Sequence, residues 1–182
     1  MALWWTLLAL VAVSSRAEVV ADLYAASVPV ANQNSDALPA AAREALAEVL
    51  VKVSGSRDLL QKPVIIAALD DARSHVQQYG YERGEAPAAA LSLRFEFDGP
   101  YITNLLRRAG APLWTANRPT VLAWVVIEDE QGRHFISKDS APLEAQLLVQ
   151  EFSRRGVPVQ LPVFDLADTT AVSLEDAWRL DA

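Results

Sequence analysis

The sequence contains no cysteine, few glycines and little positive charge. Without cysteine the chain has no disulfide bond, no thiol nucleophile and no sulfur ligand for a metal. Its 16 Lys and Arg residues face 23 Asp and Glu residues and form no basic stripe, which excludes a nucleic-acid partner because phosphate binding needs clustered cations. The seven glycines form no phosphate-binding loop. We therefore predict no cofactor and no nucleic acid.

Histidine is also scarce. The only two, His75 and His134, lie far apart in the sequence and have no third nitrogen or sulfur ligand near them. A zinc site needs three or four protein ligands, so we predict no metal site. The sequence also has no serine within a Gly-x-Ser-x-Gly motif, which leaves carboxylates as the remaining candidates for catalysis.

What the chain does have is length and apolar content. Its 182 residues, 52% of them hydrophobic, suffice for one domain of ordinary size or for one domain and part of another. The most pronounced apolar run is residues 3–13, and it is shorter than the roughly 20 residues that span a bilayer. Ser15 and Ala17, two positions apart, fit a signal-peptidase site before Glu18. We predict that residues 1–17 are a signal peptide and that the mature chain, with no integral membrane span, is periplasmic.

No lysine or arginine precedes the apolar run, which is atypical of a signal peptide. This leaves open the alternative that the run is never cleaved and tethers the protein to the membrane.

Residues 18–112 are predicted to form a first α+β domain. Apolar residues at helical spacing predict helices over 39–53 and 63–75, the first with an i,i+4 pair of Glu48 and Lys52 on its polar face. Strict alternation predicts a strand over 91–97, paired with an extended segment around Tyr79 and Tyr81 in a sheet with one packed and one wet face. The remaining elements predicted are a strand over 19–30 and a helix from Asp98 to Gly110.

Residues 113–119 are predicted to be a linker, and residues 120–182 a second α/β unit. Its expected order is a strand over 121–127 buried on both faces, a return strand, a helix over 143–155 with Leu147 inward, and a strand over 157–161. A capping box at 173–176 opens a further helix, and the sequence ends six residues after it, so we expect this unit to be incomplete. The fold class is thus α/β (α+β), with two small layered units whose helices pack on short mixed or antiparallel sheets.

Two groups of residues are candidates for a site. Trp114, Asn117 and Arg118 lie together in the proline-containing linker and form a candidate contact surface. On that interpretation Arg118→Ala weakens partner capture without lowering thermal stability. Asp165 and Asp168 follow a strand and could act as acid and base or hold a hard cation, although aspartates at such a position more often cap a turn.

Four segments resemble a known family. They are Leu-Val-Lys-Val-Ser-Gly (50–55), Gln-Gln-Tyr-Gly-Tyr (77–81), Leu-Arg-Phe-Glu-Phe-Asp (93–98) and Pro-Leu-Trp-x-x-x-Arg-Pro-x-Val-Leu-x-Trp (112–124). With them the chain resembles, from about Tyr24 to Asp168, the bacterial envelope proteins grouped as domain of unknown function 2066. The resemblance implies an exported protein and no established activity, so it brings no catalytic residues with it.

The sequence favours a non-catalytic binding or assembly module of the periplasm or cell envelope, with an envelope protein as partner. Its contact surface would be a sheet edge or the corner from Trp114 to Pro119. One alternative is a carboxylate- or metal-dependent envelope hydrolase that uses Asp165 and Asp168. The other is the membrane-tethered protein with an uncleaved N-terminal anchor.

The cleavage site gives the first testable prediction. Protein recovered from the envelope of a bacterial host should begin at Glu18, because signal peptidase requires the small residues at 15 and 17. Intact-mass spectrometry measures this directly. A chain that still begins at Met1 would contradict the signal peptide and support the tether.

Overall fold

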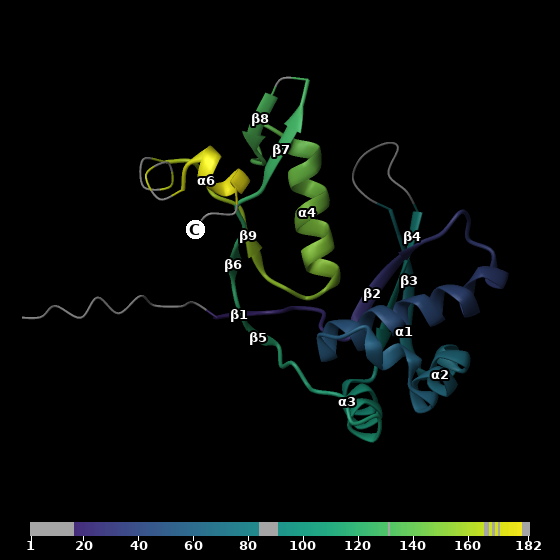
Figure 1. Cartoon of the computed structure of the whole chain (residues 1–182). Coiled ribbons are helices and arrows are strands. Elements are labelled where there is room, and N and C mark those ends of the chain that lie inside the picture. The colour runs from purple at the N-terminus through teal and green to yellow at the C-terminus, as the bar shows by residue number, and fades with distance from the viewer. Residues whose placement is uncertain are drawn as a thin grey trace, which may run out of the picture.

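The computed structural model describes residues 17–83, 91–130, 132–165, 168, 170 and 172–179. Residues 1–16, which hold nearly all of the expected signal peptide, lie outside the described residues. The elements form a mixed α and β architecture, as predicted, with several small sheets and helices packed beside them (Figure 1).

The largest sheet has three antiparallel strands in the order β2-β4-β3. They are β2 (Ala25–Pro29), β3 (Val76–Arg83) and β4 (Leu91–Phe97). The alternation of β4 buries Leu93, Phe95 and Phe97, whereas Arg94 lies among polar side chains on the opposite face. The prediction of an antiparallel pair with one packed and one wet face is confirmed.

Three helices accompany this sheet: α1 (Leu38–Ser54), α2 (Pro63–Asp70) and α3 (Gly99–Arg108). Short 3-10 turns cover Ser35–Ala37, Asp58–Gln61 and Ala72–His75. α1 packs on the sheet and contributes most to the larger core, in which Ala42, Ala45, Leu46, Val49 and Leu50 are fully buried. α3 begins as predicted, because Asp98 Oδ1 accepts a hydrogen bond of 2.6 Å from the Tyr101 N–H.

The helix predicted over 63–75 is shorter than expected. α2 ends at Asp70, and a 3-10 turn replaces its last part. The Ser74 hydroxyl donates to both the carbonyl and the carboxylate of Asp71, and such local side-chain bonds compete with the helical ladder.

The strand predicted over 19–30 is two separate strands. β1 (Ala17–Val19) is separated from β2 by a turn in which Asp22 has a φ of 56°. β1 pairs antiparallel with β5 (Asn117–Pro119), so part of the predicted linker is a strand held against the start of the described chain.

The remaining elements follow the predicted order of strand, return strand, helix and strand. They are β6 (Val121–Leu122), β7 (Val126–Asp129), β8 (Gly132–Phe135), α4 (Pro142–Arg154), β9 (Val159–Gln160) and α6 (Leu174–Arg179). β6 and β9 are parallel, and β7 and β8 form a hairpin. A second, smaller core lies here, and Ser173 Oγ accepts from the Asp176 N–H at the start of α6, as the capping box predicts.

Two predictions of burial are wrong in this region. Residues 121–127 are not a strand buried on both faces: the strand is interrupted at 123–125, and Val121 and Leu122 are exposed. β6 has only β9 as a partner among the described strands. Leu147 does not point inward either, because it is 56% exposed. Trp124, within the 121–127 segment, is half-buried, and its ring lies 5.5 and 5.7 Å from those of Phe135 and Phe164.

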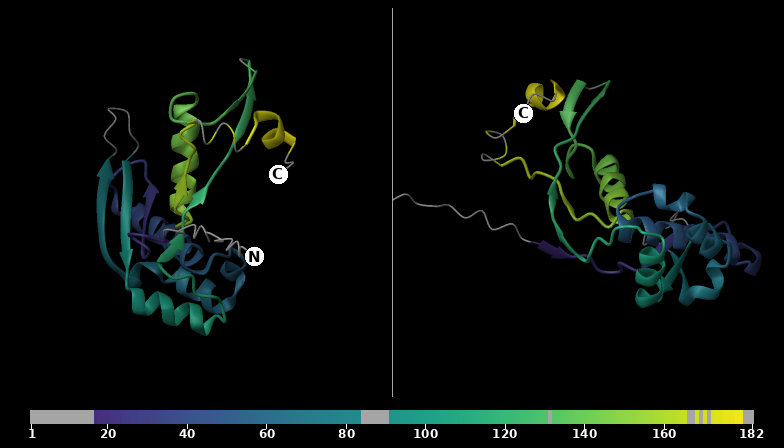
Figure 2. Two further views of the ribbon diagram at one scale, coloured as in Figure 1. Left: turned by 90° about the vertical axis from the view of Figure 1, so that its left-hand side faces the viewer. Right: turned by 60° about the horizontal axis from the view of Figure 1, so that its bottom comes forward.

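Figure 2 shows how the larger sheet faces the rest of the chain. In its left view β3 forms the outer side of the sheet, and β2 lies on the side toward α4. Among the described residues, no helix is long and apolar enough to cross a membrane. The division into units at 18–112, 113–119 and 120–182 stays a prediction.

The larger core gives the second testable prediction. Leu46→Ala should lower the free energy of unfolding by about 2–5 kcal/mol, because Leu46 is fully buried and its removal leaves a cavity. Leu143→Ala, a matched change at a leucine 62% exposed on α4, should change it by less than about 0.5 kcal/mol. Urea denaturation of both variants measures the difference, and equal losses would mean that the core does not lie around α1.

Candidate functional site

A groove of about 870 Å³ lies between β2 and α4. Its lining comes from residues 19–29, from α1 through Glu48 and Lys52, from β4 through Ser92 and Arg94, and from α4 and residues 156–159. This volume is in the upper part of the range that ligand sites occupy. The groove depends on how α4 is held beside α1, and Arg118 is central to that placement.

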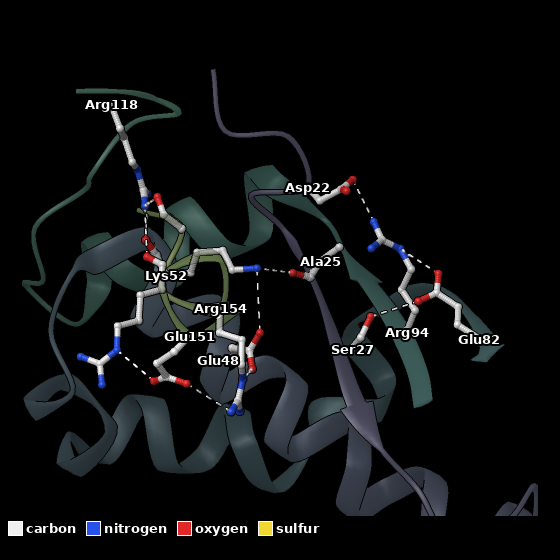
Figure 3. A network of polar contacts seen from close by, with 12 residues as sticks. Asp22, Ala25, Ser27, Glu48, Lys52, Glu82, Arg94, Arg118, Glu151 and Arg154 are labelled. Atoms are coloured by element: carbon white, nitrogen blue, oxygen red, sulfur yellow. Dashed lines mark hydrogen bonds and ion pairs between the residues drawn. The ribbon is translucent and has the colours of Figure 1, made fainter. Parts of the chain in front are cut away.

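Arg118 is 0% exposed and donates to five main-chain carbonyl oxygens. Figure 3 shows its guanidinium directed toward Lys52. Its Nε donates to Thr115 at 2.9 Å. The donor–acceptor distances of its other bonds are 2.8 Å to Lys52, 2.9 Å to Trp114, 2.6 Å to Gly156 and 3.3 Å to Arg155. A guanidinium has five N–H groups, so all of its donors are satisfied.

These acceptors place the guanidinium at the C-terminal ends of two helices. The Lys52 carbonyl belongs to the last turn of α1, and Arg155 and Gly156 directly follow α4. The last carbonyls of a helix lack intrahelical partners and carry partial negative charge, so a cation there is favourable. The ring of Trp114 lies 4.0 Å from the guanidinium carbon and adds a cation–π contact.

Arg118 therefore does not belong to an exposed contact surface. The sequence-based interpretation is corrected for this residue because its donors are all directed into the protein. Burial lowers the pKa of Arg118, but a guanidinium remains charged in proteins. Asn117 is exposed and Trp114 is half-buried, and the Trp114 N–H also donates to the Val53 carbonyl at 2.7 Å.

Gly156 makes the approach of Arg118 possible. It has a φ of 65°, and a Cβ at this position would lie 2.5 Å from Nη1 of Arg118 and 2.7 Å from Cγ of Lys52. Both the backbone conformation and the space thus require glycine. The Arg-Arg-Gly sequence (154–156) ends α4. The carbonyls of Arg155 and Gly156 also accept hydrogen bonds from Arg118.

Lys52 is the second buried cation of the site. Its Nζ donates to the Ala25 carbonyl at 2.7 Å and lies 4.0 Å from Glu48 Oε1 (Figure 3). Burial lowers the pKa of Lys52, and the nearby carboxylate of Glu48 acts in the opposite direction. The sequence predicted this i,i+4 pair on a polar helix face, but the structure buries Lys52 between α1 and β2.

Glu48 also joins α1 to α4. Its Oε2 accepts a hydrogen bond of 2.9 Å from Arg154 Nε, and this bond raises the pKa of Arg154. Arg154 and Arg155 in turn lie 3.6 and 3.2 Å from oxygens of Glu151. The end of α4 is thus held to α1 by Arg118 from one side and by Glu48 from the other.

Arg94 occupies the wet face of the sheet beside the groove. It pairs with Asp22 at 2.8 Å, with Glu96 at 3.5 Å and with Glu82 at 3.9 Å, while the Ser27 hydroxyl donates to Glu82 at 3.2 Å. The lining of the groove contains three carboxylates and three cations. They are Asp22, Glu48, Glu151, Lys52, Arg94 and Arg154. Each has an opposite charge within 4.0 Å, so the lining is locally neutral.

Asp165 and Asp168 are turned toward the local backbone. Asp168 Oδ2 accepts from the N–H groups of Val163 and Phe164, and Asp165 Oδ1 accepts from the Asp168 N–H, each at 2.9 Å. This is turn capping, and neither residue lines the groove. Within the described residues, no three side chains of His, Asp or Glu gather where they could hold a metal.

Comparison with known proteins gives one family. The model of a family described as a domain of unknown function, DUF8605, matches residues 17–115. These residues hold the three-stranded sheet and α1 to α3 but stop before Arg118 and α4. No curated protein and no solved structure matches the chain. An uncharacterised domain is thus confirmed, under a family other than the one named from sequence motifs.

The buried guanidinium gives the third testable prediction. Arg118→Ala should lower the free energy of unfolding by about 3 kcal/mol, because it removes five charge-assisted bonds and leaves buried carbonyls without donors. Arg155→Ala, at a half-exposed arginine with one surface pair, should change it by less than about 1 kcal/mol. Urea denaturation distinguishes the two, and an Arg118 variant as stable as the parent would mean that Arg118 does not hold α1 and α4 together.

Proposed function

We propose, starting from the fact that this chain belongs to the DUF8605 family, that it is an exported, non-catalytic binding module of the cell envelope. In this proposal the groove between β2 and α4 holds an extended segment of an envelope protein. The observation that supports it most is the groove itself, whose charged side chains already neutralise one another.

The lining fits a peptide better than a small charged molecule. Apolar side chains alternate with polar ones, among them Val20, Leu147, Val149, Val157 and Val159. A polyanion or polycation would find no excess of opposite charge there. A protein segment can instead place apolar side chains against α4 and residues 157–159 while its polar groups face the paired charges of the lining.

The charged groups of the groove are paired with one another, which supports binding over catalysis. Lys52 is held by Ala25 and Glu48, and the carboxylates are paired with cations. The hydrolase alternative depended on Asp165 and Asp168, whose oxygens accept main-chain hydrogen bonds. We therefore favour binding over hydrolysis.

Export is supported by the N-terminal sequence. The apolar run over 3–13, the small residues Ser15 and Ala17, and the resemblance to the envelope proteins of domain of unknown function 2066 agree with it. A periplasmic location follows if the chain is cleaved before Glu18, and a membrane-tethered location follows if it is not.

The two exposed leucines of α4 give the fourth testable prediction. Leu147 lines the groove and is 56% exposed, whereas Leu143, one turn earlier and 62% exposed, does not line it. A photo-crosslinking residue at 147 should capture one envelope protein in cells, and the same residue at 143 should not. Leu147→Arg should then weaken binding of the purified partner at least tenfold, with Leu143→Arg unchanged, as measured by titration calorimetry.

Equal crosslinking from both positions would contradict binding in the groove. So would a partner whose affinity is the same for the two arginine variants. Because both leucines are exposed, both variants should unfold at the parent's urea concentration, which separates loss of binding from loss of folding.

A further inference from the structure

The two edges of the three-stranded sheet differ in how they are protected. On the β2 edge, the Ala25 N–H donates to the Asp22 carbonyl and the Ala25 carbonyl accepts from Lys52. Pro29 is the last residue of β2 and has no N–H to donate. A cation, a turn and a proline are devices by which proteins keep an edge strand from pairing with another chain.

Among the described residues, the β3 edge has none of these three devices, and its one irregularity is a register shift between Val76 and Gln78. β3 is eight residues long, contains no proline and is exposed over most of its length. It contacts β4 on one side, and the left view of Figure 2 shows it at the outer side of the sheet, away from α4. From Gln78 on, an edge whose outward main-chain groups have no described partner is a template for strand addition.

The register shows which main-chain groups of β3 point outward. The Phe97 N–H donates to the Tyr24 carbonyl and the Val30 N–H donates to the Leu91 carbonyl, so the odd residues of β4 bond to β2. The even residues of β4 therefore bond to β3, through residues 78, 80 and 82. The N–H and C=O groups of Tyr79 and Tyr81 point away from the sheet, and no described residue pairs with them.

The tyrosine side chains of the β3 edge are also only partly covered by the rest of the protein. Tyr79 and Tyr81 lie opposite Phe95 and Leu93 and so share the face of the sheet that carries the core. Tyr79 is nevertheless 50% exposed, with its ring 6.1 Å from that of Phe95. Another strand beside β3 would extend the core over this ring.

We propose that β3 pairs antiparallel with β3 of a second copy of this chain, about a twofold axis at Gly80, to form one continuous six-stranded sheet. In this register Tyr79 lies opposite the copy's Tyr81, and Gln78 lies opposite its Glu82. No like charges face each other, and the aromatic cross-strand pairs are favourable.

Two further features of the sequence agree with a second copy of the chain as the partner of β3. Residues 77–83 carry one acid and one base, Glu82 and Arg83, so the edge is neutral in a chain whose net charge is −7. Gly80 lies on the axis, where its Cβ position has no neighbour within 4 Å. Two identical strands crossing there meet no side chain, and an isologous interface of this kind closes as a dimer.

The absence of cysteine makes the register directly testable. On the axis, the two Cα atoms of Gly80 form a non-hydrogen-bonded pair about 4.5 Å apart, within the range for a disulfide. Gly80→Cys should therefore crosslink to a dimer on mild oxidation. Gln78→Cys should not, because its two copies would lie about 13 Å apart, four residues along the strand.

A second pair of variants tests the hydrogen bonds. Tyr79→Pro removes an outward N–H that the monomer does not use, so the fold should be kept while the dimer dissociation constant rises at least tenfold. Tyr79→Thr loses the same ring but keeps the N–H, and should dimerise more tightly than the proline variant. Sedimentation equilibrium measures the masses, and urea denaturation checks the fold.

Some outcomes would overturn the proposal. One is a parent chain that stays monomeric across the micromolar range. Another is a dimer that Tyr79→Pro leaves intact, or crosslinking from residue 78 that is as fast as from residue 80. Failure here leaves binding in the groove untouched, because the groove lies at the opposite edge of the sheet and is tested through Leu147.

Discussion

The placement of α4, and with it the groove, depends on one charge that has no carboxylate partner. Arg118 is buried and is neutralised by carbonyl dipoles at the ends of α1 and α4. A buried ion costs several kcal/mol unless its hydrogen bonds are complete, so the cluster forms only when both helix ends are in place. Gly156 is part of the same constraint, since any Cβ there would displace the guanidinium. The arginine thus joins segments that the sequence separates by more than a hundred residues.

Protection of β2 and exposure of β3 follow from the same arrangement. Lys52, in the last turn of α1, donates to the Ala25 carbonyl at the β2 edge, and Glu48 one turn earlier pairs with Arg154 of α4. The β2 edge is therefore built into the groove. The β3 edge lies on the far side of the sheet, where no described helix covers it. Under the two proposals, a peptide binds in the groove on the β2 side and a second copy pairs with β3, so neither partner blocks the other.

Patterns within short segments of the sequence correctly predicted those elements whose buried face follows from the spacing of their own apolar residues. The alternation of 91–97 gave the correct face for Phe95, and the caps at Asp98 and Gly110 gave the correct ends of α3. Arg118 was placed on the surface, because nothing near it in the sequence indicates acceptors at Lys52 and Gly156. Lys52 was misjudged for the same reason. Residues 121–127 are apolar enough for a central strand, but β6 pairs with a single strand.

The cations at the helix ends also account for some of the few basic residues of the chain. The end of α3 also binds a cation from a distant segment, as the ends of α1 and α4 bind Arg118. Here Lys62 Nζ donates to the Ala109 carbonyl at 2.5 Å. Three helix ends thus receive a lysine or arginine from a distant segment, in a chain with 16 basic and 23 acidic residues. Basic residues used in this way cannot form a positive surface, and the arginines that remain near the groove are paired with carboxylates. A partner that binds in the groove as proposed is consequently selected by shape and apolar contact rather than by charge.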